Sequence, residues 1–195
     1  MSIALRFNAR HARRSGAWLL GLALAGCGGG GSNPLDNPSD VGNPAADAGQ
    51  KLSFAYYQKC INPIFLELLP IQGTSVTNTC AAGGCHDVST GSGGSFRINQ
   101  GATEVALGSP PDAAAIRLTD MYKNFKSAQG QVVFADPSAS RLINKPLVRG
   151  VLHGGGRIFL DETDPKVRLL LYWMSHPAAQ GQDEFSAPAP ASCAA

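Results

Sequence analysis

The sequence lacks the features that mark several large classes of protein. Only 15% of its 195 residues are charged and the formal net charge is +2, so no basic surface for nucleic acid is expected. The apolar run at residues 17–25 is shorter than the roughly 20 residues that cross a bilayer. There is no Ser-His-Asp arrangement, phosphate-binding loop or convincing pair of carboxylates, so the sequence predicts neither an enzyme nor a small-molecule substrate. Asp161, Glu162 and Asp164 cluster just before an expected helix, where acidic residues complement the helix dipole.

The N-terminus has the three parts of a secretory leader. A basic stretch with four arginines precedes the apolar run, and small residues then precede Cys27. The segment Leu24-Ala25-Gly26-Cys27 resembles the bacterial lipobox, whose cysteine carries lipid after the leader is cut. The resemblance implies that residues 1–26 are a signal peptide and that several acyl chains on Cys27 anchor the protein to a membrane. Gly28 after the cysteine, in place of aspartate, resembles the outer-membrane pattern of the enterobacterial lipoprotein sorting rule, which implies the outer membrane. The alternative is an ordinary secretory leader with a chance cysteine.

The rest of the chain divides into a linker, one domain and a tail. Residues 27–48 are rich in Gly, Pro, Ser, Asn and Asp, and their composition predicts a flexible spacer. A single domain is expected over residues 49–185, followed by an Ala- and Pro-rich tail over 186–195 that a cysteine ties back. Four of the 16 Lys and Arg residues and none of the 14 Asp and Glu residues lie in the leader. Its removal therefore leaves 12 basic against 14 acidic residues, which again does not favour nucleic-acid binding.

The domain is predicted to be small and mainly α-helical, with long glycine-rich loops. Apolar residues at helical spacing, helix-starting Asx-Pro pairs and the stop at Pro177 predict helices over residues 50–61, 63–69, 112–125, 137–145 and 165–176. No strand alternation extends beyond a few residues, and 95–98 and 131–134 are the best strand candidates. There is no internal repeat. Long loops in a compact domain indicate that a cofactor or disulfides stabilise the core.

The cysteines carry the most specific chemistry. Of the five, Cys27 is assigned to lipid, and the other four belong to an oxidising compartment where disulfides persist. Cys80, Cys85 and the adjacent His86 have the order of c-type haem attachment, in which two thiols bond the haem and the following histidine ligates iron. The spacer is four residues in place of the usual two, which resembles a minority variant among multihaem cytochromes. Cys60 and Cys193 are then left to form a disulfide.

The order of motifs after Cys80 resembles the cytochrome c-like domains of planctomycete-type exported proteins. The segments, in chain order, read CHDVSTGSGGSFRI, DPSASRLINKPL, LHGGGRIF and DPKVRLLLYWM. The resemblance implies a domain whose first and last helices pack beside one haem c, with Cys80 and Cys85 as thioether anchors and His86 as the proximal ligand. It places His153 in the distal-ligand loop, where a neutral imidazole can bind iron. Two histidine ligands leave no open position, so the resemblance implies electron transfer with redox protein partners in the periplasm or at the cell surface.

Two other interpretations of the same residues remain open. In the first, Cys80 and Cys85 form a disulfide, Cys60 pairs with Cys193, and the protein is a disulfide-stapled binding or structural lipoprotein without a cofactor. In the second, Cys80, Cys85, His86 and His153 hold zinc, although adjacent Cys and His residues are poorly placed to bind one ion. The remaining possible ligands are expected to be structural. These are two methionines on apolar helical faces and a histidine at a helix C-terminus, namely Met121, Met174 and His176.

Overall fold

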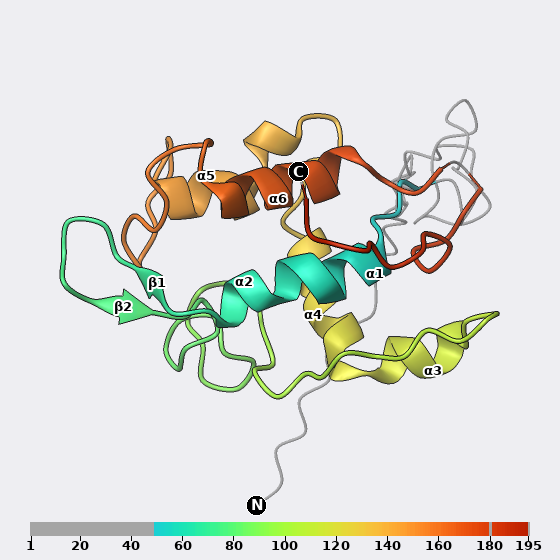
Figure 1. Ribbon diagram of the computed structural model, residues 1–195. Coiled ribbons are helices and arrows are strands. Elements are labelled where there is room, and N and C mark those ends of the chain that lie inside the picture. The colour runs from blue at the N-terminus through green and yellow to red at the C-terminus, as the bar shows by residue number, and fades with distance from the viewer. Residues whose placement is uncertain (1–48, 180, 195) are drawn as a thin grey trace, which may run out of the picture. The chain divides into compact units, whose positions relative to one another are not determined.

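The computed structural model describes residues 49–179 and 181–194, and this part of the chain is largely helical (Figure 1). The predicted mainly α class is therefore confirmed. The predicted signal peptide, the predicted lipidation site Cys27 and the predicted linker over 27–48 lie outside the described residues. Within the described residues, no helix has the length and apolar character needed to cross a membrane.

The first helical segment is continuous where the sequence predicts two helices. It comprises α1 (Phe54–Tyr56), a π-helical turn (Tyr57–Ile61) and α2 (Asn62–Leu66). It begins four residues later than predicted because Ser53 caps it, its side-chain oxygen accepting a hydrogen bond from the Tyr56 amide. The wider π turn admits Pro63, whose missing N–H would otherwise break the helix.

The predicted helix over 112–125 is divided in two at Thr119. Residues Ala113–Leu118 form α3 and Asp120–Gln129 form α4. Thr119 has extended backbone angles (φ −71°, ψ 154°), and its hydroxyl accepts a hydrogen bond from the Tyr122 amide. The apolar spacing continues across the break, so periodicity alone could not reveal this new N-cap.

The later helices are close to their predicted positions. A 3-10 turn at Pro137–Ala139 leads into α5 (Arg141–Leu147), which accommodates Pro146 and ends where Val148 adopts a left-handed conformation (φ 54°). The last helix, α6 (Pro165–Ser175), is capped by Asp164, whose carboxylate accepts a hydrogen bond from the Lys166 amide.

The strand candidates at 95–98 and 131–134 were wrong. The strands of the described chain are β1 (Leu69–Pro70) and β2 (Thr77–Asn78), an antiparallel pair with Leu69 opposite Asn78. Ile98 makes only an isolated parallel bridge with Asp87. The 95–98 segment is held by loop contacts, so its short apolar pattern reflects burial and does not indicate a sheet.

An aromatic core joins the first helical segment to α4 and α6. Tyr57, Phe125 and Trp173 are fully buried, with ring centroids 5.4 Å apart for Tyr57–Trp173 and 5.5 Å for Tyr57–Phe125. The Trp173 indole N–H donates to the Ser53 carbonyl at 3.0 Å. First and last helices therefore share one core, with Met121 and Met174 also buried as core residues.

The C-terminal tail is tied back to the first helical segment. Cys60 and Cys193 form a disulfide with an S–S distance of 2.10 Å, which is the pairing preferred from the sequence. The Lys59 ammonium donates to the Pro190 carbonyl, and the Tyr56 hydroxyl donates to the Ala194 carbonyl. The tail thus covers part of the segment that carries the core aromatics.

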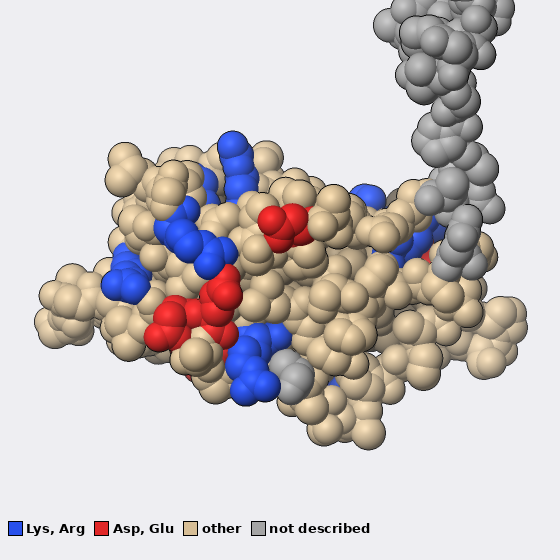
Figure 2. Space-filling view, turned by 90° about the horizontal axis from the view of Figure 1, so that it is seen from above, with Lys and Arg blue, Asp and Glu red and all other residues tan. Residues whose placement is uncertain are grey.

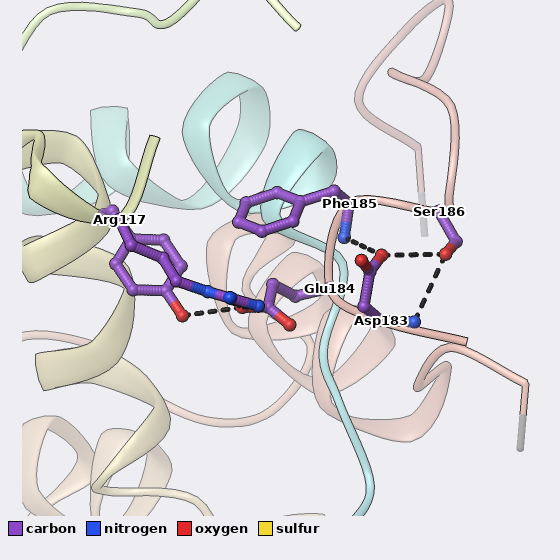
Figure 3. Close-up of polar contacts among 6 residues, drawn as sticks. Arg117, Asp183, Glu184, Phe185 and Ser186 are labelled. Atoms are coloured by element: carbon purple, nitrogen blue, oxygen red, sulfur yellow. Dashed lines mark hydrogen bonds and ion pairs between the residues drawn. The ribbon is translucent and has the colours of Figure 1, made fainter. Parts of the chain in front are cut away.

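A buried carboxylate, that of Glu184, fixes the chain just before this tail (Figure 3). Glu184 Oε1 accepts hydrogen bonds from the Arg117 guanidinium on α3 and from the Tyr122 hydroxyl on α4, at 3.0 and 2.6 Å. Burial acts to raise the pKa of Glu184, but the hydrogen bonds from Tyr122, its own backbone and Arg117 outweigh burial and lower it. Burial and the hydrogen bond to Glu184 raise the pKa of Tyr122 to about 12. The neighbouring Phe185 ring packs 5.3 Å from the Arg117 guanidinium carbon.

We predict that Glu184→Gln lowers the free energy of unfolding by about 1–3 kcal/mol at pH 7, the usual contribution of hydrogen bonds to a charged group. Glutamine must turn its NH₂ group either toward donors or toward the buried Oε2 position, where no acceptor lies within the described structure. Because the pKa of Glu184 is lowered by folding, its contribution is present above the unfolded pKa near 4.3 and disappears as the pH falls through the folded pKa.

Urea unfolding at pH 7 and at pH 3 tests this prediction, with the exposed Glu104→Gln as the matched control. The difference between wild type and Glu184→Gln is expected to shrink at the lower pH. An equal difference at both pH values would contradict the assignment.

Candidate functional site

The loop that carries Cys80, Cys85 and His86 is closed by its own backbone. The His86 amide donates to the Cys80 carbonyl at 3.1 Å, and the Cys85 amide donates to the Ala82 carbonyl at 3.0 Å. The Ala81 amide binds the Phe65 carbonyl, which fixes the loop to the end of α2. The two thiols and the imidazole therefore leave the same compact turn, although four residues separate the cysteines.

An aspartate stabilises the turn that follows. Asp87 Oδ1 accepts hydrogen bonds from the amides and hydroxyls of Ser89 and Thr90, at 2.7 to 2.9 Å. These bonds, led by the one from the Ser89 hydroxyl, hold the pKa of Asp87 well below its usual range. The carboxylate thus remains charged and keeps the chain turning back toward Gly93.

His86 is oriented from several sides. Its Nδ1 is 3.0 Å from the Phe96 carbonyl, and its ring centroid is 4.8 Å from that of Phe96. Burial lowers the pKa of His86, and the nearby His153, Arg97 and Lys145 act in the same direction against the hydrogen bond to Phe96. The imidazole is therefore neutral at pH 7, with Nδ1 occupied and Nε2 left as the free nitrogen.

Because Gly93 has no side chain, the His86 ring can pack directly against its backbone. A Cβ added at Gly93 would lie 2.5 Å from His86 Nδ1 and 2.8 Å from the Cys85 carbonyl oxygen. The Gly93 amide also donates to that carbonyl at 2.7 Å. Only glycine allows the backbone to come this close to the ring.

We predict that Gly93→Ala displaces His86 and destabilises the protein by about 1–3 kcal/mol, the usual cost of overpacking. The expected displacement would appear as a changed chemical shift and a changed pH titration of the His86 ring by NMR. Gly154→Ala is the matched control, because a Cβ there meets nothing within 4 Å. Identical His86 resonances in wild type and Gly93→Ala would contradict the packing.

His153 lies on a separate loop between α5 and α6. Its Nδ1 is 2.7 Å from the Gly156 carbonyl oxygen, which again leaves Nε2 as the free nitrogen. Gly156 has φ +78°, and a Cβ there would lie 2.9 Å from Ile71. The Lys145 ammonium donates to the Leu152 carbonyl at 3.3 Å, and the Gln72 amide donates to the Arg157 carbonyl at 2.8 Å. The loop is thus held by α5 on one side and by the β1–β2 hairpin on the other.

The structure brings His86 and His153 together across a shared cavity. Their ring centroids are 6.3 Å apart and their planes differ by 18°. Two imidazoles that bind one metal ion from opposite sides have centroids roughly 6–6.5 Å apart, because each metal–nitrogen bond is about 2.0–2.1 Å and the nitrogen lies roughly 1.1 Å from the ring centre. The observed separation matches that spacing, and each ring already has its Nδ1 bound to a backbone carbonyl.

The shared cavity has a volume of about 460 Å³, within the range of roughly 300–1,000 Å³ for cofactor and small-molecule sites. Both histidines and both thiols line it. Its apolar wall comes from α2, β1, the loop between β2 and α3, α5, the loop between α5 and α6, and α6. The residues are Ile64, Phe65, Leu69, Phe96, Leu142, Ile158, Phe159 and Leu170. A second hollow, more open and of about 910 Å³, borders His153 but contains neither thiol nor His86.

Cys80 and Cys85 are not bonded to each other in this structure. Burial, with the nearby Cys85, raises the pKa of Cys80 to about 12, so this thiol is protonated at neutral pH. The Asn78 side-chain amide lies 3.9 Å from Cys85 Sγ. Among the described residues, no group of three or more His, Cys, Asp or Glu side chains is placed to hold a metal ion. The tetrahedral zinc site considered from the sequence, with Cys80, Cys85, His86 and His153 as ligands, is therefore not assembled in the described structure.

The other histidine of the described domain is placed apart from the cavity. The His176 ring stacks on Tyr172, with centroids 4.0 Å apart, and its Nδ1 lies 2.8 Å from the Tyr172 carbonyl oxygen. It follows the last residue of α6, as a helix-terminal residue should. The sequence thus selected the two histidines that share a cavity and set aside the one that does not.

The face of the molecule seen in Figure 2 carries charges of both signs. In the view from above, Lys and Arg side chains are interspersed with Asp and Glu side chains (Figure 2).

Sequence reasoning missed the two cations that line the cavity, Arg141 and Lys145, because their spacing on α5 resembles that of any solvent-facing pair. It also missed the packing role of Gly93.

No protein-family model matches the chain, and no curated protein or solved structure matches it either.

Proposed function

We propose that this protein is a lipid-anchored, c-type cytochrome-like carrier that holds one covalent haem and transfers electrons between redox proteins of the cell envelope. The observation that carries the proposal is that His86 and His153 face one cavity, with ring centroids 6.3 Å apart. The same cavity is lined by Cys80 and Cys85, whose thiols are free. The apolar wall, the cavity size and the two occupied Nδ1 atoms fit that group.

Each residue has a separate role in this proposal. Cys80 and Cys85 would hold the group through thioether bonds, and His86 and His153 would hold it through their Nε2 atoms. The Phe96 and Gly156 carbonyls fix the tautomer and direction of the two rings. A bound haem would supply a one-electron couple. Because His86 and His153 would both bind the iron, the site would favour electron transfer over substrate binding.

The lipid anchor and the linker complete the proposal. Cys27 would place the carrier at a membrane, with the outer membrane favoured, and residues 27–48 would give the domain reach toward its partners. The face seen in Figure 2 carries charges of both signs, which is consistent with a protein partner.

A haem stain of a denaturing gel tests the proposal. The full chain, with its leader, is expressed in a host that has haem-attachment machinery, beside a Cys80→Ser/Cys85→Ser variant and a matched Cys60→Ser/Cys193→Ser variant. We expect peroxidase activity to stay with the wild type and with the Cys60/Cys193 variant and to be lost from the Cys80/Cys85 variant. An unstained wild type with both thiols free or oxidised to a disulfide would overturn the proposal and favour a cofactor-free binding or structural lipoprotein.

A further inference from the structure

The charged residues that line the shared cavity are all cations. Arg141 and Lys145, one turn apart on α5, border it, whereas no Asp or Glu does. Residues four apart on a helix lie on the same face, so both side chains reach the same edge. Arg141 is exposed and Lys145 half-buried, which places this edge at the mouth of the cavity.

Neither cation is neutralised by the protein. Within the described residues, neither Arg141 nor Lys145 forms a salt bridge. The Lys145 ammonium donates a hydrogen bond to the Leu152 carbonyl. By contrast, Arg117, Lys123, Arg149 and Lys166 each pair with a carboxylate. Two unpaired cations beside an apolar cavity indicate a ligand with an apolar body and an anionic end.

Polar groups of Gln131 and Ser95 line the cavity beside Arg141 and Lys145. The Arg141 amide binds the Gln131 carbonyl at 3.0 Å, and the Gln131 side chain donates to the Ser95 hydroxyl at 3.1 Å. All three residues line the cavity. One edge of the cavity is therefore polar and basic, while its wall is apolar, as an amphipathic ligand requires.

We propose that Arg141 and Lys145 bind the two carboxylates of the porphyrin, an inference that rests on the function proposed above. The Arg141 guanidinium can bind a carboxylate through two parallel hydrogen bonds, and the Lys145 ammonium can bind one as a point charge. Lys145 also holds the carbonyl next to His153, so the same side chain links carboxylate binding to the placement of the distal loop.

Reversible binding separates this inference from covalent attachment. The full chain carrying Cys80→Ser and Cys85→Ser is titrated with haemin and with haemin dimethyl ester, whose carboxylates are neutral, and the absorption spectrum reports binding. We expect the ester to bind about 10–100-fold more weakly than haemin, the range that charge-assisted hydrogen bonds allow. Adding Arg141→Gln and Lys145→Gln should weaken haemin by a similar factor and the ester by much less, because the ester loses only what Lys145 contributes through its hydrogen bond to the Leu152 carbonyl. The control, Lys126→Gln with Arg168→Gln, removes two exposed cations elsewhere and should change neither.

The outcomes distinguish the two proposals. The carboxylate site would be overturned if haemin and the ester bound with equal affinity, or if the Arg141/Lys145 variant lost affinity equally for both. Either result would leave the cytochrome proposal standing. If the serine variant does not fold, the covalently loaded protein is used, and the pH dependence of its reduction potential is compared. The Arg141/Lys145 variant should then shift the apparent carboxylate pKa upward by about one unit, and an unchanged profile would overturn the site. A chain that takes up no haem in either form would overturn both proposals.

Discussion

On the proposed function, His153→Ala should keep covalent haem but lose one of its two iron-binding histidines, whereas His86→Ala should lower the amount of attached haem about tenfold or more. His86 leaves the same compact turn as both thiols, because its amide is bound to the Cys80 carbonyl and Cys85 precedes it directly. His153 stands on a separate loop that Lys145 and Gln72 hold from outside. Removing the hydrogen bond that supports a metal ligand lowers metal affinity about 10–100-fold. Removing the ligand itself should lower it by at least as much.

Haem stain and visible absorption measure the two parts of this prediction. The His153→Ala protein should stain like wild type, show a five-coordinate spectrum and bind carbon monoxide when reduced, which the wild type should not. His176→Ala is the matched control, since that ring stacks on Tyr172 outside the cavity. A His153→Ala spectrum identical to that of wild type would show that another side chain is the distal ligand.

Removing the Cys60–Cys193 disulfide is expected to lower the free energy of unfolding by about 5 kcal/mol. The two cysteines are 133 residues apart, so the bond closes nearly the whole domain, and the chain-entropy relation gives its largest values for such long loops. The loss should free the tail, whose polar contacts to Lys59 and Tyr56 are at the surface or half-buried.

Thermal unfolding of Cys60→Ser/Cys193→Ser against wild type measures this effect. The double substitution leaves no unpaired thiol from the disulfide, and the haem stain serves as the control for an intact Cys80/Cys85 site. A change of the unfolding free energy below about 1 kcal/mol would show that the denatured chain is already constrained without the bond.

Local chemistry allowed most helices to be predicted from the sequence. Asp164-Pro165 combines an N-cap with a first-turn proline, and α6 begins there. The predicted helix boundaries were wrong where a local hydrogen bond changes the helix without changing the apolar spacing. The Thr119 cap divides one predicted helix, and the π turn before Pro63 joins two. The strand at Leu69–Pro70 could not be predicted, because its two residues gain their pairing only from a tertiary hairpin.

The candidate site was predictable to the extent that its chemistry is local. Cys80, Cys85 and His86 are adjacent in the chain, so their order alone suggested the site. His153 came only from the resemblance in motif order, because its distance from His86 depends on how α5 and the hairpin hold its loop. Arg141 and Lys145 carried no signal in the sequence, since only the cavity distinguishes them from other exposed cations.

The most direct test of this account is the haem content of the purified mature protein, measured by pyridine haemochrome assay and assigned by mass spectrometry of its peptides. The account predicts one haem per chain, bonded to the peptide that contains Cys80 and Cys85, with Cys60 and Cys193 recovered as a disulfide-linked pair. A protein without covalent haem, in which Cys80 is bonded to Cys85 or both bind zinc, would contradict it.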